Sequence, residues 1–202
     1  DGGVKNPKSS AWQMAGFGIW WCNPPSPSEN EVMTRYTFQE LIGGGVMMWG
    51  NMTGQHSHST RTELAAVLVA MLRPIPLHIA SDSQAMIDKA NFLIDQAVLW
   101  QLTVSSEHWS TVNPCRKAWG LQKDGDLWER FWAASLLRGP RTLKLTKVKA
   151  HCGAKEIEQG IITLEETIGN DFSDTAETRG TGEGHPGLLR LASWLVDRHD
   201  SY

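Results

Sequence analysis

The chain has 202 residues and a formal charge of −3 at pH 7, from 19 basic and 22 acidic side chains. Its 41% hydrophobic and 20% charged residues exclude a disordered chain and a collagen-like repeat, and three cysteines are too few for a disulfide scaffold. The odd cysteine count, with neither an apolar signal core nor a run of about 18 apolar residues, predicts a soluble intracellular protein of the cytoplasm or nucleus without membrane contact.

The first third of the chain alternates short apolar runs with turn residues, which is typical of antiparallel strands. Residues 14–22 are apolar and aromatic and end at the breaker run NPPSPS. Residues 32–42 partly alternate before three glycines, and the apolar run VMMWG follows at 46–50. This region therefore predicts two or three antiparallel strands joined by turns.

The pattern then changes to helices alternating with strands. Five segments are predicted, in chain order: a helix over 59–73, a strand over 76–81, helices over 83–100 and 126–139, and a strand over 142–150. The first helix begins at Ser59 or Thr60, with Glu63 placed as in a capping box, and Gly139 ends the third. Helical pattern returns from residue 170 and breaks at GTGEGHPG. We expect one mixed α/β layered domain over 1–202, with a C-terminal helical extension at 180–202.

Four acidic residues stand where strand ends and first helical turns place side chains together. Asp82 follows a buried strand, Glu63 lies in a first helical turn, Asp1 precedes two glycines, and Asp174 lies one turn beyond Asn170. Taken singly, each is a cap or a turn residue. Taken together, clustered carboxylates without basic neighbours favour a divalent cation such as Mg²⁺ or Mn²⁺.

Short motifs around these acids resemble those of the type 1 ribonuclease H family. The family patterns are D-G-S…N-P, N-N-R-x-E-L, T-D-S-Q, D-L-W, V-K-G-H-x-G and G-N-x-x-A-D. The matching segments, in the same order, are Asp1-Gly2-Gly3 with Asn6-Pro7, Ser59-Thr60-Arg61-Thr62-Glu63-Leu64, Ser81-Asp82-Ser83-Gln84, Asp126-Leu127-Trp128, Val148-Lys149-Ala150-His151-Cys152-Gly153 and Gly169-Asn170-Asp171-Phe172-Ser173-Asp174. One such motif is weak, whereas the ordered set spans residues 1 to about 180.

The resemblance implies a three-layer fold, in which helices flank a mixed five-stranded sheet of three antiparallel strands followed by two parallel ones. It also implies a catalytic centre with two Mg²⁺ ions, for which Mn²⁺ can substitute. Asp1 would bridge the ions, Glu63 and Asp82 would complete one, and Asp174 the other. His151 would move protons or help product release.

The implied reaction is hydrolysis of the RNA strand of an RNA–DNA hybrid, leaving 3′-hydroxyl and 5′-phosphate ends. The matching positions imply five substrate-binding residues: Asn6, Ser59, Thr60, Arg61 and Gln84. The family reaches the minor groove at Ser59, Thr60 and Gln84, where the 2′-hydroxyl distinguishes RNA from DNA.

The net charge of −3 is the sum of segments with opposite charge. Residues 116–149 carry 9 basic and 3 acidic groups, whereas residues 150–202 carry 4 basic and 10 acidic groups. A basic segment with interleaved tryptophans is typical of a surface that follows phosphates. We expect four residues to matter most for binding: Arg116, Lys117, Trp119 and Lys123. Trp128 and Trp132, one helical turn apart, are expected in the core.

Three features depart from the family pattern. Asp1 is the first residue, without the apolar residues that precede the family's first aspartate, so we expect a truncated first strand and a fragment of a longer protein. Ser59 and Thr60 replace two asparagines. The interval from His151 to Asp174 is long and carries an acidic insert, AKEIEQGIITLEETI.

Two further functional classes remain open. One is a catalytically silent hybrid-binding or connecting domain of the same fold; the other is a different nuclease of the superfamily, such as an exonuclease or a strand-transfer enzyme. The intact set of four acids favours an active ribonuclease H. Two origins are compatible with the sequence: a retroelement polyprotein with a reverse transcriptase domain in the same polypeptide, and a cellular enzyme that removes hybrids.

Overall fold

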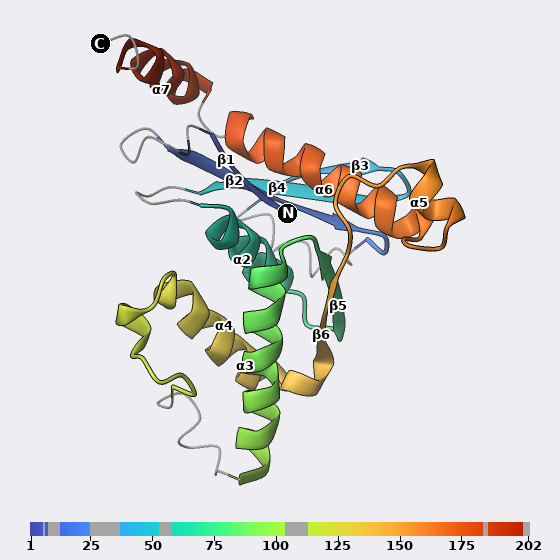
Figure 1. Cartoon of the computed structure of the whole chain (residues 1–202), viewed down its shortest axis with the longest axis vertical. Helices are drawn as coiled ribbons and strands as arrows, with labels where there is room; N and C mark the ends of the chain where they lie inside the picture. Colours follow the sequence, from blue (N-terminus) through green and yellow to red (C-terminus); the bar gives the residue numbers. More distant parts are fainter. Residues whose placement is uncertain are drawn as a thin grey trace.

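The computed structural model describes residues 1–5, 7, 13–24, 37–52, 58–103, 113–183 and 186–199. Four strands form an antiparallel sheet in the order β1-β2-β4-β3 (Figure 1): β1 (Gly2–Lys5), β2 (Met14–Trp21), β3 (Phe38–Ile42) and β4 (Gly45–Met52). A separate parallel pair consists of β5 (Leu77–Ser81) and β6 (Leu143–Lys147). The predicted strands are therefore present, with β3 as an edge strand paired to β4.

The expected single five-stranded sheet is wrong, because the described strands divide into a sheet of four and a sheet of two. β1 pairs with β2 from Gly2 to Lys5. Ser81, the last residue of β5, lies near the beginning of β1, because Ser81 and Gly2 both donate a hydrogen bond to Glu63. Among the described residues, β5 pairs with β6 and not with β1. The two sheets consequently share no ladder in the described part of the chain.

Helices cover both faces of the antiparallel sheet (Figure 1). The helices are α2 (Ser59–Ala70), α3 (Gln84–Thr103), α4 (Gly125–Arg138), α5 (Ala154–Glu158), α6 (Leu164–Glu183) and α7 (Pro186–His199), with 3₁₀ turns at Trp119–Leu121 and Pro140–Thr142. A Cβ added at Gly2 would meet Thr62 of α2, and one at Gly3 would meet Glu177 of α6. α2 and α6 thus lie on opposite sides of β1.

The main core lies between α2, α3, α4 and the β5–β6 pair. Trp128, Phe131 and Trp132 of α4 are all buried there, which confirms the prediction for the two tryptophans. A second cluster packs Phe17 and Ile19 of β2 against α2, and a third packs β4 against α6. None of the described helices combines the length and apolarity needed to cross a membrane.

Two helix starts differ from the sequence prediction. His58 precedes α2 without a side-chain cap, and Glu63 is buried, so the expected capping box is wrong. α6 begins at Leu164, earlier than the expected residue 170, because Thr163 and Glu166 form a reciprocal cap: each accepts a backbone N–H from the other, at 3.2 and 2.9 Å. Much of the acidic insert is therefore helical.

The end of α6 also differs. α6 continues through Gly180 to Glu183, and α7 begins at Pro186, so the predicted break at 180–187 is shorter than expected. Glycines allow α6 to approach β2 and β4 closely, since a Cβ added at Gly180 would lie 2.5 Å from the Gly50 carbonyl oxygen and 3.0 Å from that of Phe17. The expectation of one domain over 1–202 stays a prediction.

Gly180→Ala is expected to lower the free energy of unfolding by about 1–3 kcal/mol, because the added methyl group meets the backbone of the sheet. Gly182→Ala, in the same helix, adds a methyl group with no heavy atom within 4 Å and should be neutral or stabilise by up to about 1 kcal/mol. Urea unfolding of both variants measures the difference. Equal effects would contradict the close contact between α6 and the sheet.

Candidate metal centre

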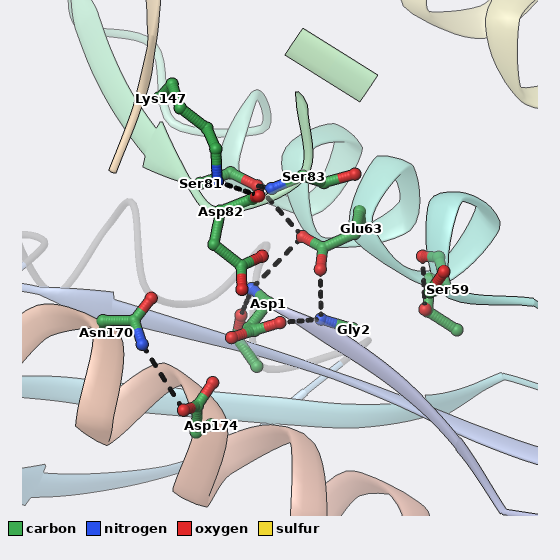
Figure 2. A network of polar contacts seen from close by, with 12 residues as sticks. Asp1, Gly2, Ser59, Glu63, Ser81, Asp82, Ser83, Lys147, Asn170 and Asp174 are labelled. Carbon is green, nitrogen blue, oxygen red and sulfur yellow. Dashed lines mark hydrogen bonds and ion pairs between the residues drawn. The ribbon is translucent and has the colours of Figure 1, made fainter. Parts of the chain in front are cut away.

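Three carboxylates converge from three elements (Figure 2). Asp1 lies directly before β1, Glu63 lies in α2, and Asp82 follows the last residue of β5. Each offers an oxygen atom, and these atoms all lie within 4.8 Å of one another. Oxygen donors from several carboxylates are the ligands that hard divalent cations prefer, so this group can hold such an ion.

Glu63 is the most enclosed member of the group, with 4% of its surface exposed. Its carboxylate accepts hydrogen bonds from the Gly2 backbone N–H at 3.2 Å and the Ser81 hydroxyl at 3.1 Å. The Asp1 α-ammonium lies 4.0 Å from the same carboxylate. Burial raises the pKa of Glu63, and the neighbouring Asp82 also raises it, against the lowering effect of the ammonium. The negative charge is therefore only partly compensated.

Asp174 lies on α6, on the other side of β1 from Glu63 (Figure 2). It does not belong to the group within 4.8 Å. Burial, followed by the nearby charge of Asp82, raises the pKa of the Asp174 carboxyl. The Asn170 amide donates to its Oδ2 at 3.4 Å, and His151 Nδ1 lies 3.7 Å from the same oxygen. The four predicted acids thus face one region, and three of them lie close enough together to hold one cation.

His151 occupies a turn after β6 with a left-handed backbone, φ 51°. Its side chain is 83% exposed, so the imidazole is open to solvent and borders the acids only through Asp174.

The turn that carries Asp82 is held by two contacts that the sequence analysis did not identify. Lys147 Nζ donates to the Asp82 backbone carbonyl, and the Ser83 N–H donates to the Ser81 hydroxyl oxygen at 3.1 Å. Ser81 and Lys147 are paired in the parallel β5–β6 register. The sequence predicted a strand with a basic face over 142–150 that includes Lys147, whereas β6 ends at Lys147.

The predicted substrate-binding residues surround the centre unevenly. Ser59 and Gln84 are exposed at the first residues of α2 and α3, and Thr60 is half-buried. The Gln84 amide donates to Asp88 at 2.6 Å. Asn6 lies outside the described residues. Before α4, three cations are exposed and one tryptophan is half-buried against the main core: Arg116, Lys117, Lys123 and Trp119.

Arg61 has protein partners rather than an open guanidinium. It donates to the two oxygens of Asp126 at 2.8 and 2.7 Å and to Asp124 at 3.3 Å. Asp124 also lies 2.9 Å from His58 Nε2. These contacts join the start of α2 to the start of α4, and the hydrogen bonds from Arg61 lower the pKa of Asp126.

Arg61→Gln is expected to lower the free energy of unfolding by roughly 1 kcal/mol or less near pH 7. Because the folded-state pKa of Asp126 is depressed, this stabilisation is present above the unfolded pKa, near 3.8, and is lost as the pH falls through the folded value. Urea unfolding of both proteins from pH 7 to pH 3 should therefore show a difference that shrinks in acid. Arg130→Gln, at an exposed position of α4, is the control. A constant difference across this range would contradict the pairing.

No protein-family model matches the chain, and no curated protein matches it. One solved structure is similar over 90% of both chains, with 17% sequence identity and a TM-score of 0.47. It is described as the structure of the foamy viral protease-reverse transcriptase in complex with dsDNA. A likeness of this size establishes neither a shared fold nor a shared activity.

Proposed function

We propose that the chain is a divalent-cation-dependent ribonuclease H that hydrolyses the RNA strand of RNA–DNA hybrids to 3′-hydroxyl and 5′-phosphate ends. The observation that carries the proposal is the convergence of Asp1, Glu63 and Asp82, with oxygen atoms within 4.8 Å of one another. These residues are far apart in the sequence, and each belongs to a motif that resembles the same family. Asp174, the fourth acid of the pattern, faces the same region from α6.

The group of Asp1, Glu63 and Asp82 fits one hard cation. In the proposed pair of ions, Glu63 and Asp82 would hold one, Asp174 would hold the other, and Asp1 would serve both. The incompletely compensated charge of buried Glu63 supports this assignment, because a cation in contact supplies the missing compensation. When bound, Mg²⁺ supplies positive charge that acidifies an attacking water and stabilises the departing oxygen.

His151 is proposed to transfer protons at the edge of the site. Nδ1 stands 3.7 Å from Asp174 Oδ2, and the rest of the ring is exposed. Its open position suits proton exchange between solvent and the reacting end of the substrate.

Substrate contact is proposed along the edge formed by the starts of α2 and α3 and the basic segment before α4. Ser59 and Thr60 hydroxyls and the Gln84 amide can exchange hydrogen bonds with a 2′-hydroxyl in a minor groove. Arg116, Lys117 and Lys123 are exposed and can follow a phosphate backbone.

The deciding experiment incubates the full chain with Mg²⁺ and a hybrid labelled separately on each strand. We expect cleavage of the RNA strand only, and its loss in Asp82→Asn by at least about 100-fold, because a cation-holding oxygen is replaced by an amide. Asp95→Asn, at an exposed position of α3, is the matched control and should cleave normally.

Mn²⁺ titration of the same variants distinguishes a wrong assignment of the reaction from a wrong assignment of the metal ligands. Tight hybrid binding without cleavage by the wild type would favour the catalytically silent domain. Undiminished cleavage by Asp82→Asn would contradict the assigned centre, and normal Mn²⁺ binding by that variant would contradict its role as a ligand.

Replacing both Lys117 and Lys123 by Gln is expected to weaken hybrid binding and to make it less dependent on salt. Each lost phosphate contact should reduce the slope of log affinity against log salt by roughly 0.9. Fluorescence anisotropy at several salt concentrations measures this slope. Arg190→Gln, exposed on α7, should leave the salt slope unchanged. An unaltered slope in the double variant would show that the basic segment does not contact the hybrid.

A further inference from the structure

Lys147, the last residue of β6, reaches across the parallel β5–β6 pair to the turn that carries Asp82 (Figure 2). Its backbone is in register with Ser81, the last residue of β5. Its ammonium group donates to two backbone carbonyls, that of Asp82 across the pair and that of Val148 at 2.9 Å. One side chain therefore joins the residues that follow both strands.

The turn after β5 is held from several directions. The Ser83 N–H donates to the Ser81 hydroxyl oxygen at 3.1 Å, and the same hydroxyl donates to the Glu63 carboxylate at 3.1 Å. These contacts fix the residues on either side of Asp82. The hydrogen bond from Lys147 fixes the carbonyl of Asp82 itself.

The contact to the Asp82 carbonyl bears on the carboxylate of the same residue. The direction of a carbonyl follows the backbone angle ψ, and the rotamers open to a side chain depend on φ and ψ. Asp82 belongs to the group of three acids whose oxygen atoms lie within 4.8 Å of one another. A change of backbone angle at Asp82 would therefore move its carboxylate relative to the other two.

The second carbonyl that Lys147 contacts lies where the chain leaves β6 toward His151. This carbonyl belongs to Val148, which is buried and whose N–H donates to the Ser81 carbonyl at 3.0 Å. The ammonium group thus joins the segment that carries Asp82 to the segment that carries the proposed proton-transfer group.

We infer that Lys147 is a positioning residue of the candidate metal centre, which orients the Asp82 carboxylate through the Asp82 backbone. The inference rests on the proposed function, since it assigns Asp82 as a cation ligand. A lysine beside such a centre has two opposite effects: its charge repels a cation, whereas its hydrogen bonds hold a ligand in place. Loss of the ammonium group should therefore weaken cation binding if Lys147 positions Asp82, and tighten it if Lys147 acts only as a charge.

The test compares Mn²⁺ binding by three variants of the full chain, followed by electron paramagnetic resonance of the free ion. Lys147→Met keeps an unbranched side chain without a donor, and should weaken binding about tenfold. Lys147→Arg keeps donors and charge, and should bind within about twofold of the wild type. Lys144→Met removes an equal charge at another exposed position of β6, in register with His78, and should not weaken binding.

Amide hydrogen exchange without any cation gives a second measurement that does not depend on metal or activity. Lys147→Met should speed exchange of the Ser83 amide at least about fivefold, because the turn opens more often, while Lys147→Arg should not. The amide of Phe131, in the main core, should exchange at the wild-type rate in both variants. Faster exchange at both amides would indicate general destabilisation and contradict a local role.

The remaining outcomes are equally decisive. Unchanged or tighter Mn²⁺ binding by Lys147→Met would overturn the positioning role, and unchanged Ser83 exchange would show that Lys147 does not hold the turn. Equal losses in Lys147→Arg and Lys147→Met would contradict the hydrogen bonds as the cause. Failure of the wild type to cleave a hybrid, with the Mn²⁺ and exchange differences present, would overturn the nuclease assignment and leave the positioning role standing.

Discussion

The site depends on one buried carboxylate. The Glu63 carboxylate links α2 to two strands. It accepts hydrogen bonds from the Gly2 N–H of β1 and from the Ser81 hydroxyl at the end of β5. Enclosing a charge costs free energy unless it is paired, and the raised pKa of Glu63 reflects that cost. The same contacts fix the ends of two strands from different sheets at one point, so the candidate metal centre lies at the junction between the sheets.

Glycine packing determines where the fourth acid lies. A Cβ at Gly18 would clash with the Ser173 carbonyl, one residue before Asp174, and one at Gly16 would clash with Thr181. Without these side chains α6 approaches β2 closely enough to bring Asp174 to the edge of the group formed around Glu63. The candidate acids therefore come from both faces of the sheet: Glu63 lies on α2 and Asp174 lies on α6.

Local patterns predicted most elements, because apolar period and turn residues are local properties. β2, α2, β5, α4 and β6 lie where alternation and helical spacing indicated, and Gly139 ends α4. Contacts between distant residues were not predictable in this way. The partners of Arg61 are Asp124 and Asp126, more than 60 positions away, so a residue in a substrate-contact motif proved to be held by ion pairs. The division into two sheets likewise depends on where strands end in space.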